Sequence, residues 1–284
     1  MENQNYEKKG YLLEDFRLFH LADDNHGEFP YHYHAFHKVI VVLAGRTEYA
    51  VEGERYALEP GDFVLVGRGS IHRPIMTEGE FYERIVFYIS PEYLRRESTE
   101  DCSLLQLFSG EKGHVLRTQQ RLFRLASQLE QELGEVGYGR EILSSSALLR
   151  LLVQIGRAME KNPDPGAGAK LPTSPRIREI MAYIEAHLEE DLDAETIADA
   201  FFVTKFHMMR QFRRETGTTV HHYITQKRLI RARELMDGGM RATEACYRSG
   251  FRSYSSFTRA CAKHFGATPT GRLDTHYVRE EAPE

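Results

Sequence analysis

Short runs of apolar residues, separated by turn residues, fill the first third of the chain. Apolar and polar positions alternate, most clearly over residues 49–51 and 85–88, and this spacing is typical of β-strands with one buried face. The pattern predicts strands over residues 16–21, 37–43, 47–51, 55–58, 62–66 and 82–89. Strands this short and this evenly spaced indicate a β-sandwich or a β-barrel.

The apolar period changes to that of an α-helix after residue 117. Leucines recur on one stripe of a helix predicted over 117–134, and a second helix is predicted over 140–160. Because the connection over 135–139 is short, the two helices should pack as an antiparallel pair. We expect their wide apolar faces to cover the barrel and also to form a homodimer; the alternative is that they only cover the barrel.

Four prolines and two glycines lie within residues 161–175, which predicts an exposed interdomain linker. Helical spacing resumes after this stretch, so the expected fold class is α+β. A β-rich segment covers 1–110, a helical segment 111–160, the linker 161–175 and an all-helical segment 176–284.

The all-helical segment contains one pattern twice, offset by 49 residues. The first copy has Thr204, Met208, Arg210, Gly217 and Thr219, and the second has Ser253, Phe257, Arg259, Gly266 and Thr268. Each copy consists of a small polar helix cap, an apolar inward residue, an outward arginine and a closing glycine. A short helix and a tight turn precede each copy, so we predict two helix-turn-helix units, joined by a long helix over 220–236.

Residue spacing divides the second helix of each unit into two faces. Met208 and Phe212 can pack inward in the first unit, and Phe257 and Cys261 in the second. The outward residues are Phe206, Met209, Arg210 and Arg213 in the first unit, and Tyr254, Ser255, Ser256, Arg259 and Lys263 in the second. Arginine can bind guanine through two hydrogen bonds, and apolar side chains can contact a thymine methyl. These faces are candidate DNA contacts, and a merely solvated basic face is the alternative.

The net charge of −5 at first argues against a nucleic-acid partner. Residues 204–272 nevertheless contain 14 Lys and Arg against 4 Asp and Glu, a local net charge of about +10. Local clustering decides whether a face attracts phosphates, so double-stranded DNA remains the expected partner. The sequence has no bilayer-spanning apolar run and no secretory signal, which predicts a cytoplasmic protein without a membrane partner. Three scattered cysteines indicate neither disulfides nor a cysteine zinc site.

A two-part histidine spacing stands out in the β-rich segment. His32-x-His34 leads into a strand, Pro60-Gly61-Asp62 makes a turn, and Gly69-x-x-His72 follows. This spacing resembles the two-part motif of the cupins and implies a cupin-like barrel. In metal-binding cupins a glutamate follows the histidine pair four residues later, whereas this chain has Lys38 there.

Lys38 would repel a metal ion held by the three histidines, so we expect no metal and no cofactor. A three-histidine metal site is the alternative. A lysine among imidazoles at a barrel mouth suits a hydroxylated or anionic small molecule. The candidate effector-binding residues are His32, His34, Lys38, His72, Arg73, Glu83 and Arg84. Each of the last three can instead be a solvated charge.

The all-helical segment closely resembles the AraC/XylS transcriptional regulators over about 100 residues, through 206–219, 227–236 and 249–269. The signature GF…F-T-R…G-x-T-P is highly specific. The resemblance implies that Lys205, Phe206, Met209 and Arg210 in the first unit, and Tyr254, Ser255, Ser256 and Arg259 in the second, approach DNA. Cys261 stands where a bulky aromatic is usual, so we expect the first unit to carry more sequence specificity.

The cupin-like barrel with its helical pair also resembles the effector-binding and dimerisation half of these regulators. The resulting hypothesis is a non-enzymatic transcription regulator, an activator as in most family members, that responds to a sugar or related metabolite. RNA polymerase is a further partner that the resemblance implies. The alternatives are a metal-dependent cupin enzyme fused to a DNA-binding domain, and a constitutive DNA-binding protein whose barrel is only a dimer scaffold.

Overall fold

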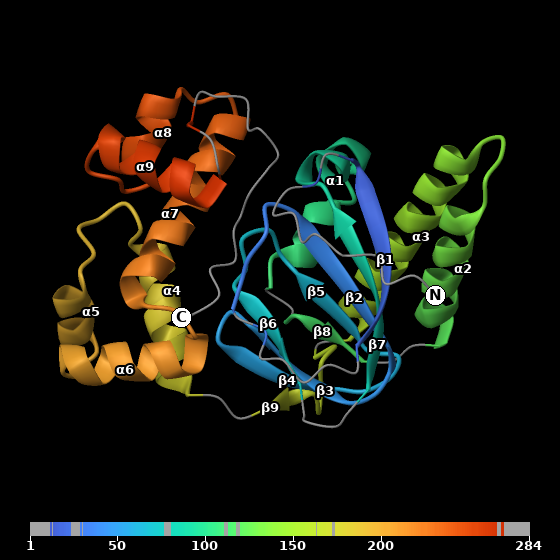
Figure 1. The fold of residues 1–284 in the computed structure, drawn as a ribbon, viewed down its shortest axis with the longest axis horizontal. Helices are drawn as coiled ribbons and strands as arrows, with labels where there is room; N and C mark the ends of the chain where they lie inside the picture. Colours follow the sequence, from blue (N-terminus) through green and yellow to red (C-terminus); the bar gives the residue numbers. More distant parts are fainter. Residues whose placement is uncertain are drawn as a thin grey trace. The chain divides into compact units, whose positions relative to one another are not determined.

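The computed structural model forms two compact units, which divide between Thr173 and Ser174. The residues that it describes are 12, 14–23, 29, 31–76, 81–110, 113–117, 120–162, 164–171, 174–265 and 268–269. The division falls inside the predicted linker. Figure 1 shows strands and helices in the first unit and helices alone in the second, which confirms the predicted α+β class.

Two antiparallel sheets build the first unit. One has the strand order β1-β7-β2-β5-β8 and the other β6-β3-β4-β9. The strands are β1 (Phe16–Asp23), β2 (His37–Ala44), β3 (Thr47–Val51), β4 (Glu54–Leu58), β5 (Phe63–Val66), β6 (His72–Ile75), β7 (Tyr82–Ile89), β8 (Val115–Leu116) and β9 (Lys170–Leu171). All six predicted strands are confirmed, and β6, β8 and β9 are additional.

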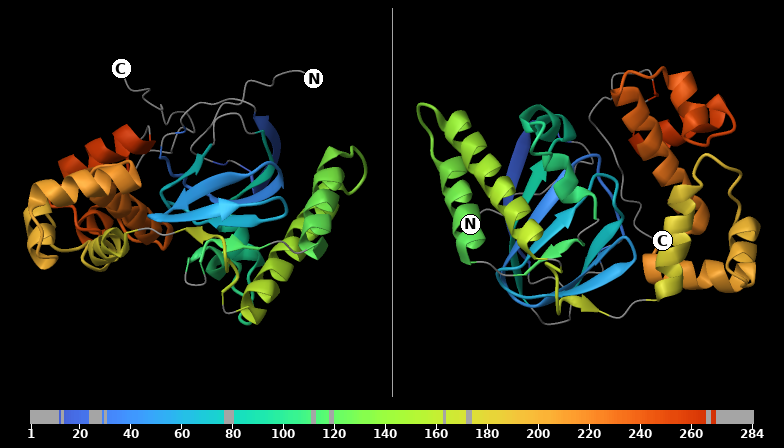
Figure 2. Two further views of the ribbon diagram at one scale, coloured as in Figure 1. Left: turned by 90° about the horizontal axis from the view of Figure 1, so that it is seen from below. Right: turned by 180° about the vertical axis from the view of Figure 1, so that it is seen from behind.

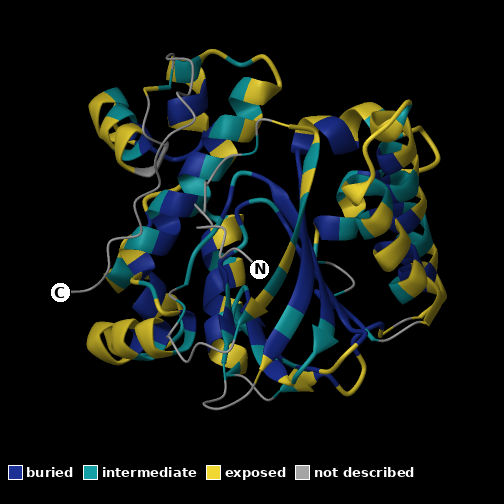
Figure 3. Ribbon diagram, turned by 45° about the vertical axis from the view of Figure 1, so that its right-hand side comes forward, coloured by how far each residue is buried: buried dark blue, intermediate teal, exposed yellow. Residues whose placement is uncertain are grey.

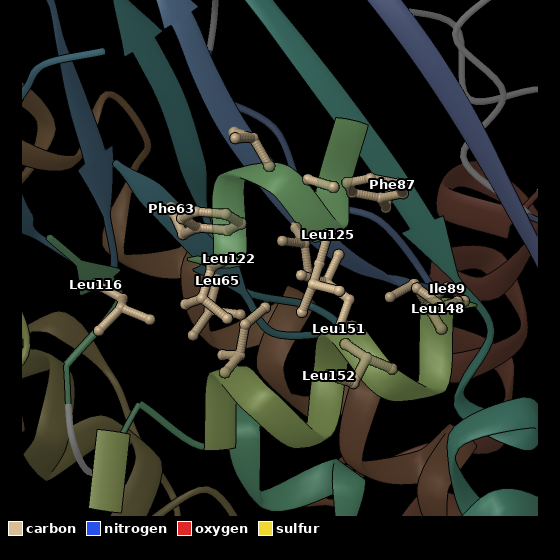
Figure 4. Packing of buried hydrophobic residues seen from close by; sticks show 14 of the residues in the cluster. Phe63, Leu65, Phe87, Ile89, Leu116, Leu122, Leu125, Leu148, Leu151 and Leu152 are labelled. Atoms are coloured by element: carbon tan, nitrogen blue, oxygen red, sulfur yellow. The ribbon is translucent and has the colours of Figure 1, made fainter. Parts of the chain in front are cut away.

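The central pair β2 and β7 defines the two faces of the larger sheet. Their register places Val39 opposite Phe87 and Val41 opposite Ile85 on one face, and Lys38 opposite Tyr88 on the other. The first face is packed against helices α2 (Gln120–Gly134) and α3 (Arg140–Lys161), which lie outside the sheet (Figure 2). In Figure 4 the side chains of this sheet face and of the two helices interdigitate in one core. The other face, with Lys38, points into the barrel.

Two short elements fill the chain between β7 and β8, where the sequence carried no prediction. Helix α1 (Pro91–Glu97) is capped by Ser90, whose side chain accepts a hydrogen bond from the Tyr93 amide. A 3-10 turn, η1 (Leu104–Phe108), buries two apolar residues against the same core. Both extend the layer that covers the outer face of the sheet.

The predicted linker is exposed at only some of residues 164–171, among them Asp164, Ala167 and Gly168. Pro165, Gly166 and Ala169 are buried, and β9 pairs with β4 at the edge of the smaller sheet. Lys170 also forms an ion pair with Glu54 of β4. Proline and glycine prevent a helix here, but they do not prevent a segment from lying along a sheet edge.

The helical pair has a buried side and an exposed end. By length and composition alone α3 could cross a membrane, and no other helix of the described residues could. Its Leu148, Leu151, Leu152 and Ile155 are fully buried in the core, as in a core helix. The turn between the two helices is exposed (Figure 3), and apolar side chains gather there: Val136, Tyr138, Ile142 and Leu143.

His20 of β1 joins the sheet to α2 through two carboxylates. Its Nδ1 lies 2.5 Å from Glu130 of α2, and its Nε2 lies 2.9 Å from Glu83 of β7. Burial alone would lower the pKa of His20, but the hydrogen bonds to Glu83 and Glu130 raise it. The bridge therefore stabilises the fold fully below the ordinary pKa near 6.5, and this contribution is lost as the pH rises through the folded-state value.

We expect His20→Ala to cost more unfolding free energy at pH 5.5 than at pH 8, because only the charged imidazolium gains from both carboxylates. Denaturant titration of both proteins across this range measures the difference. Arg55→Ala is the control, since it removes an exposed ion pair with Glu48 that involves no histidine. The prediction would be contradicted if the loss of unfolding free energy in His20→Ala changed with pH no more than the loss in Arg55→Ala does.

The second unit contains six helices within the described residues (Figure 1). They are α4 (Pro175–Ala186), α5 (Ala194–Ala200), α6 (Lys205–Thr216), α7 (Val220–Asp237), α8 (Ala242–Arg248) and α9 (Tyr254–Phe265). The predicted caps Thr204 and Ser253 are confirmed, because each accepts from a backbone amide of the following helix, and Gly217 ends α6 in the left-handed region. Asp193 caps α5 in the same way. Helix α7 runs from the α5–α6 pair to the α8–α9 pair, as the spacing predicts.

Candidate effector chamber and DNA-reading helices

The inner face of the barrel carries a group of polar and aromatic side chains, which we call the chamber. Lys38 and Tyr88 lie opposite each other on β2 and β7, and Arg84 follows on the same face. His32 pairs with His72 through backbone hydrogen bonds of 3.1 and 2.9 Å, which bring the first histidine segment onto β6. The strand pattern thus gathers residues that are 40 or more positions apart in the sequence.

Three imidazoles meet at one end of the chamber. The rings of His32 and His72 are 4.4 Å apart between centroids, and those of His34 and His72 are 5.3 Å apart. Lys38 Nζ lies 3.1 Å from His72 Nε2 and 5.3 Å from the centre of the Tyr88 ring. Burial, and next the Lys38 charge, hold the pKa of His72 well below its ordinary value, so this imidazole is neutral at pH 7.

The hydrogen bonds of His72 decide how it can bind a metal. Its Nδ1 lies 2.8 Å from the Ser70 carbonyl, an acceptor, so Nδ1 carries the proton. Nε2 therefore has the lone pair and accepts from Lys38. The ring nitrogens of His32, His34 and His72 lie within 4.8 Å of one another, but the one that would have to ligate a metal is occupied by an ammonium group. These residues do not fit a metal centre.

Buried tyrosines continue the chamber beside the imidazoles. Tyr49 of β3 stacks on His72 with ring centroids 6.1 Å apart, and burial, and next Tyr82, raise its pKa well above the ordinary value. Tyr82 is fully buried, and its hydroxyl has no hydrogen-bond partner among the described residues. Burial raises the pKa of Tyr82 to about 12. A buried hydroxyl without a partner costs about 1–3 kcal/mol, which a bound polar ligand can recover.

Arg84 lies beside Tyr82, with its guanidinium 4.5 Å from the ring centre and 2.6 Å from the Asp23 carboxylate. The chamber therefore holds an ammonium, a paired guanidinium, imidazoles and phenols between aromatic faces. Such a set offers donors, acceptors and flat apolar surfaces within a short reach, which is the composition of a site for a small polar molecule.

Two of the predicted effector contacts lie elsewhere. Glu83 points to the helix layer, where it binds His20, because neighbouring residues of a strand face opposite sides of the sheet. Arg73 lies on the opposite face of β6 from His72, with its guanidinium 4.5 Å from the ring of Tyr31. The structure thus brings together five of the seven candidates: His32, His34, Lys38, His72 and Arg84.

Sequence reasoning missed the aromatic part of the chamber. Phe36, Tyr49, Tyr82 and Tyr88 are buried there, and Phe36 stacks on His34 at 4.6 Å. The sequence did contain a signal for these residues, because side chains an even number of positions apart in an extended chain point to the same side. Phe36 is two positions from Lys38, and Tyr82 and Tyr88 are two and four positions from Arg84.

Helix α6 has the two faces that the spacing predicts. Met208 and Phe212 are buried, whereas Phe206 is 84% exposed. Met209, Arg210 and Arg213 are exposed, as is Lys205, which lies 3.6 Å from Glu195. Large apolar side chains in water beside arginines are unusual on a helix without a binding partner.

The turn before α6 adds an aromatic side chain that the sequence reasoning did not use. Phe202 is 96% exposed and takes a φ of 53°, a left-handed conformation that side chains with a Cβ seldom adopt. It precedes the cap residue Thr204 and so lies close to the N-terminus of α6.

Helix α9 presents a smaller and more polar face. Ser255, Ser256, Arg259 and Lys263 are exposed, whereas Tyr254 is only partly exposed and packs on the core of this unit. The core cluster consists of Leu229, Ala232, Cys246, Phe251, Phe257 and Cys261. Burial raises the pKa of Cys261 to about 12, so this thiol is protonated and serves packing.

A barrel whose inner face gathers polar and aromatic side chains, followed by a unit with two helix-turn-helix pairs, is the architecture of a ligand-responsive DNA-binding regulator. Comparison with known families agrees in both halves: an AraC-like ligand binding domain matches residues 16–152, and a helix-turn-helix domain matches residues 197–273. The chain belongs to the AraC/XylS family of transcriptional regulators.

Two relatives match most of the chain in sequence. The HTH-type transcriptional activator RhaS of Escherichia fergusonii is 25% identical over 244 residues, which are 86% of this chain and 87% of that protein. RhaS of Enterobacter sp. is 28% identical over 257 residues, 85% of this chain and 86% of that protein. The crystal structure of ToxT from Vibrio cholerae covers 90% of this chain and 97% of its own, with 15% identity and a TM-score of 0.39.

Proposed function

We propose that this regulator activates transcription when a small hydroxylated or anionic molecule, with sugars as the first class to test, binds the chamber. The observation that carries the proposal is the set of converging polar groups on the inner barrel face: Lys38 on His72, Arg84 on Asp23, and the Tyr82 hydroxyl without a partner among the described residues. Sugars present hydroxyl groups for such donors and acceptors and apolar faces for aromatic rings. The RhaS relatives are named as transcriptional activators, which supports activation of transcription by this protein.

A thermal-shift screen of the full chain against sugars and small carboxylic acids tests the effector site. A ligand present at 100 times its Kd should add roughly 2.7 kcal/mol to the stability of the barrel. Tyr82→Phe should be at least as stable as the wild type without ligand, because it removes a buried hydroxyl that no described residue satisfies. The same variant should lose most of the ligand-induced shift.

Glu83→Gln is the matched control, since the side chain of Glu83 lies on the other face of β7. It should keep the ligand-induced shift of the wild type. An equal shift for Tyr82→Phe and the wild type would remove Tyr82 from the effector site. If no compound stabilises the protein or alters its DNA binding, the barrel is a dimer scaffold instead.

We further propose that DNA is read by α6 through Lys205, Phe206, Met209, Arg210 and Arg213, and by α9 through Tyr254, Ser255, Ser256, Arg259 and Lys263. The exposure of Phe206 and Met209 next to arginines supports this assignment. Exposed apolar side chains at the α2–α3 turn support a homodimer formed through the helical pair. The match to a helix-turn-helix domain supports a cytoplasmic location, where the DNA is. Sedimentation equilibrium of the full chain measures the dimer, and transcription in vitro measures contact with RNA polymerase.

A further inference from the structure

The segment that follows α4 is held by one side chain of α7. After α4 ends at Ala186, the chain offers two carbonyl groups toward Arg228, which lies near the middle of α7. Arg228 donates from Nε to the Leu188 carbonyl at 2.9 Å and from Nη2 to the Glu190 carbonyl at 2.7 Å. This two-point contact ties the start of the first helix-turn-helix unit to the connecting helix.

The turn of the second helix-turn-helix unit meets the same point. Gly250, between α8 and α9, has a φ of +92°, and a Cβ added to it would lie 1.8 Å from the Leu188 carbonyl oxygen and 2.7 Å from Arg228 Nε. Both the backbone conformation and the close contact therefore require glycine here. Beside this contact, Arg252 of the same turn forms an ion pair with Asp191 at 2.5 Å.

Three parts of the unit thus converge at one place: the end of α4, the middle of α7 and the turn that leads into α9. We propose that Arg228, Gly250 and the carbonyls of Leu188 and Glu190 form a clamp that fixes α9 relative to α6. Arg228 and Gly250 are then positioning residues. They determine which spacing the protein accepts between the DNA element that α6 contacts and the DNA element that α9 contacts. This inference rests on the proposed reading of DNA by α6 and α9.

The physical reason is the helical repeat of DNA. One inserted base pair moves the second element by about 3.4 Å and rotates it by roughly 35° around the axis. A rigid pair of helices cannot follow that rotation, whereas a pair with a loosened contact can. The core of the second unit includes Leu229 and Ala232 of α7, so α8 and α9 stay packed on α7 when the clamp is released.

Spacing dependence is the measurement that separates this role from simple stability. Wild-type full chain selects its preferred duplex from a random pool, and footprinting locates the two elements. For the wild type, one inserted or deleted base pair between the elements should weaken binding at least tenfold. For Arg228→Met the loss should shrink to threefold or less, while affinity for a duplex with one scrambled element stays within about twofold of the wild type.

Arg231→Met is the matched control: the same substitution in the same helix, at an exposed arginine 3.7 Å from Glu234. It should keep the tenfold penalty. Arg252→Ala removes only the exposed ion pair beside the clamp, which also joins the α8–α9 turn to the segment after α4, and it should relax the spacing in the same direction if Arg228→Met does not fold. An undiminished spacing penalty in both Arg228→Met and Arg252→Ala would overturn the clamp. A wild-type footprint with a single element would instead overturn the two-helix reading and the clamp with it.

Discussion

Phe257→Ala should destabilise the second helix-turn-helix unit by about 3–5 kcal/mol, the usual cost of deleting a buried phenylalanine ring. Phe257 is fully buried, and its ring centre lies 5.2 Å from that of Phe251 and 5.9 Å from that of Tyr254. Apart from Leu229 and Phe251, the buried residues that form the cluster with Phe257 are small: Ala232, Cys246 and Cys261. Few large side chains surround Phe257, so the loss of its ring leaves a cavity that its neighbours fill poorly.

Hydrogen exchange of the α8 and α9 amides in the full chain measures this effect, because it reports the opening of one unit separately from the barrel. Protection of α9 should fall, while protection of β2 and β7 should stay at the wild-type level. Tyr247→Ala is the control, since it removes an aromatic ring that is 54% exposed on α8, and it should cost less than about 0.5 kcal/mol. Equal exchange in Phe257→Ala and Tyr247→Ala would show that the cluster does not hold the unit together.

Elements with a regular apolar period were predictable from the sequence, and the short elements that lack one were not. Strands β2 and β7 and helices α3 and α7 carry enough apolar positions for the period to be read. Strand β6 was missed because it has four residues, including a proline, and β8 and β9 have two each. Their pairing depends on partners elsewhere in the chain, which no local pattern records.

The candidate effector site could be predicted in part, because its histidines follow a known spacing. The aromatic half was missed because Tyr49, Tyr82 and Tyr88 read as ordinary core residues, and only strand register brings them next to Lys38 and His72. Glu83 and Arg84 were both predicted to line the site, but only Arg84 points there. One step along a strand reverses the face, so a pair of adjacent charges cannot both line one chamber.

The Arg228 clamp lay beyond sequence reasoning for the same reason. Arg228 reads as one more basic residue of a charged helix, and Gly250 as an ordinary turn glycine. Only the folded chain brings the Leu188 carbonyl between them. A surface with a local net charge of about +10 between residues 204 and 272 therefore contains arginines of at least two kinds, some that face solvent and one that holds backbone.

Arg210→Ala should lower affinity for the selected duplex more than affinity for random DNA, by roughly 1–3 kcal/mol. Arg210 is exposed on α6 between Met209 and the buried Phe212, on the face that we propose enters the major groove. An arginine that binds one guanine through two hydrogen bonds loses both contacts on truncation, and random DNA seldom places guanine there. Fluorescence anisotropy with both duplexes, at one fixed salt concentration, gives the two affinities.

Arg213→Ala is the contrasting variant, one helical turn further along the same exposed face. If Arg213 contacts phosphate, its loss should weaken binding to both duplexes alike and reduce the slope of log affinity against log salt by about one unit. Arg210→Ala should change that slope less than it changes specificity. Equal losses on selected and random DNA for Arg210→Ala would make it a phosphate contact, and the specificity of α6 would then have to come from Phe206 and Met209.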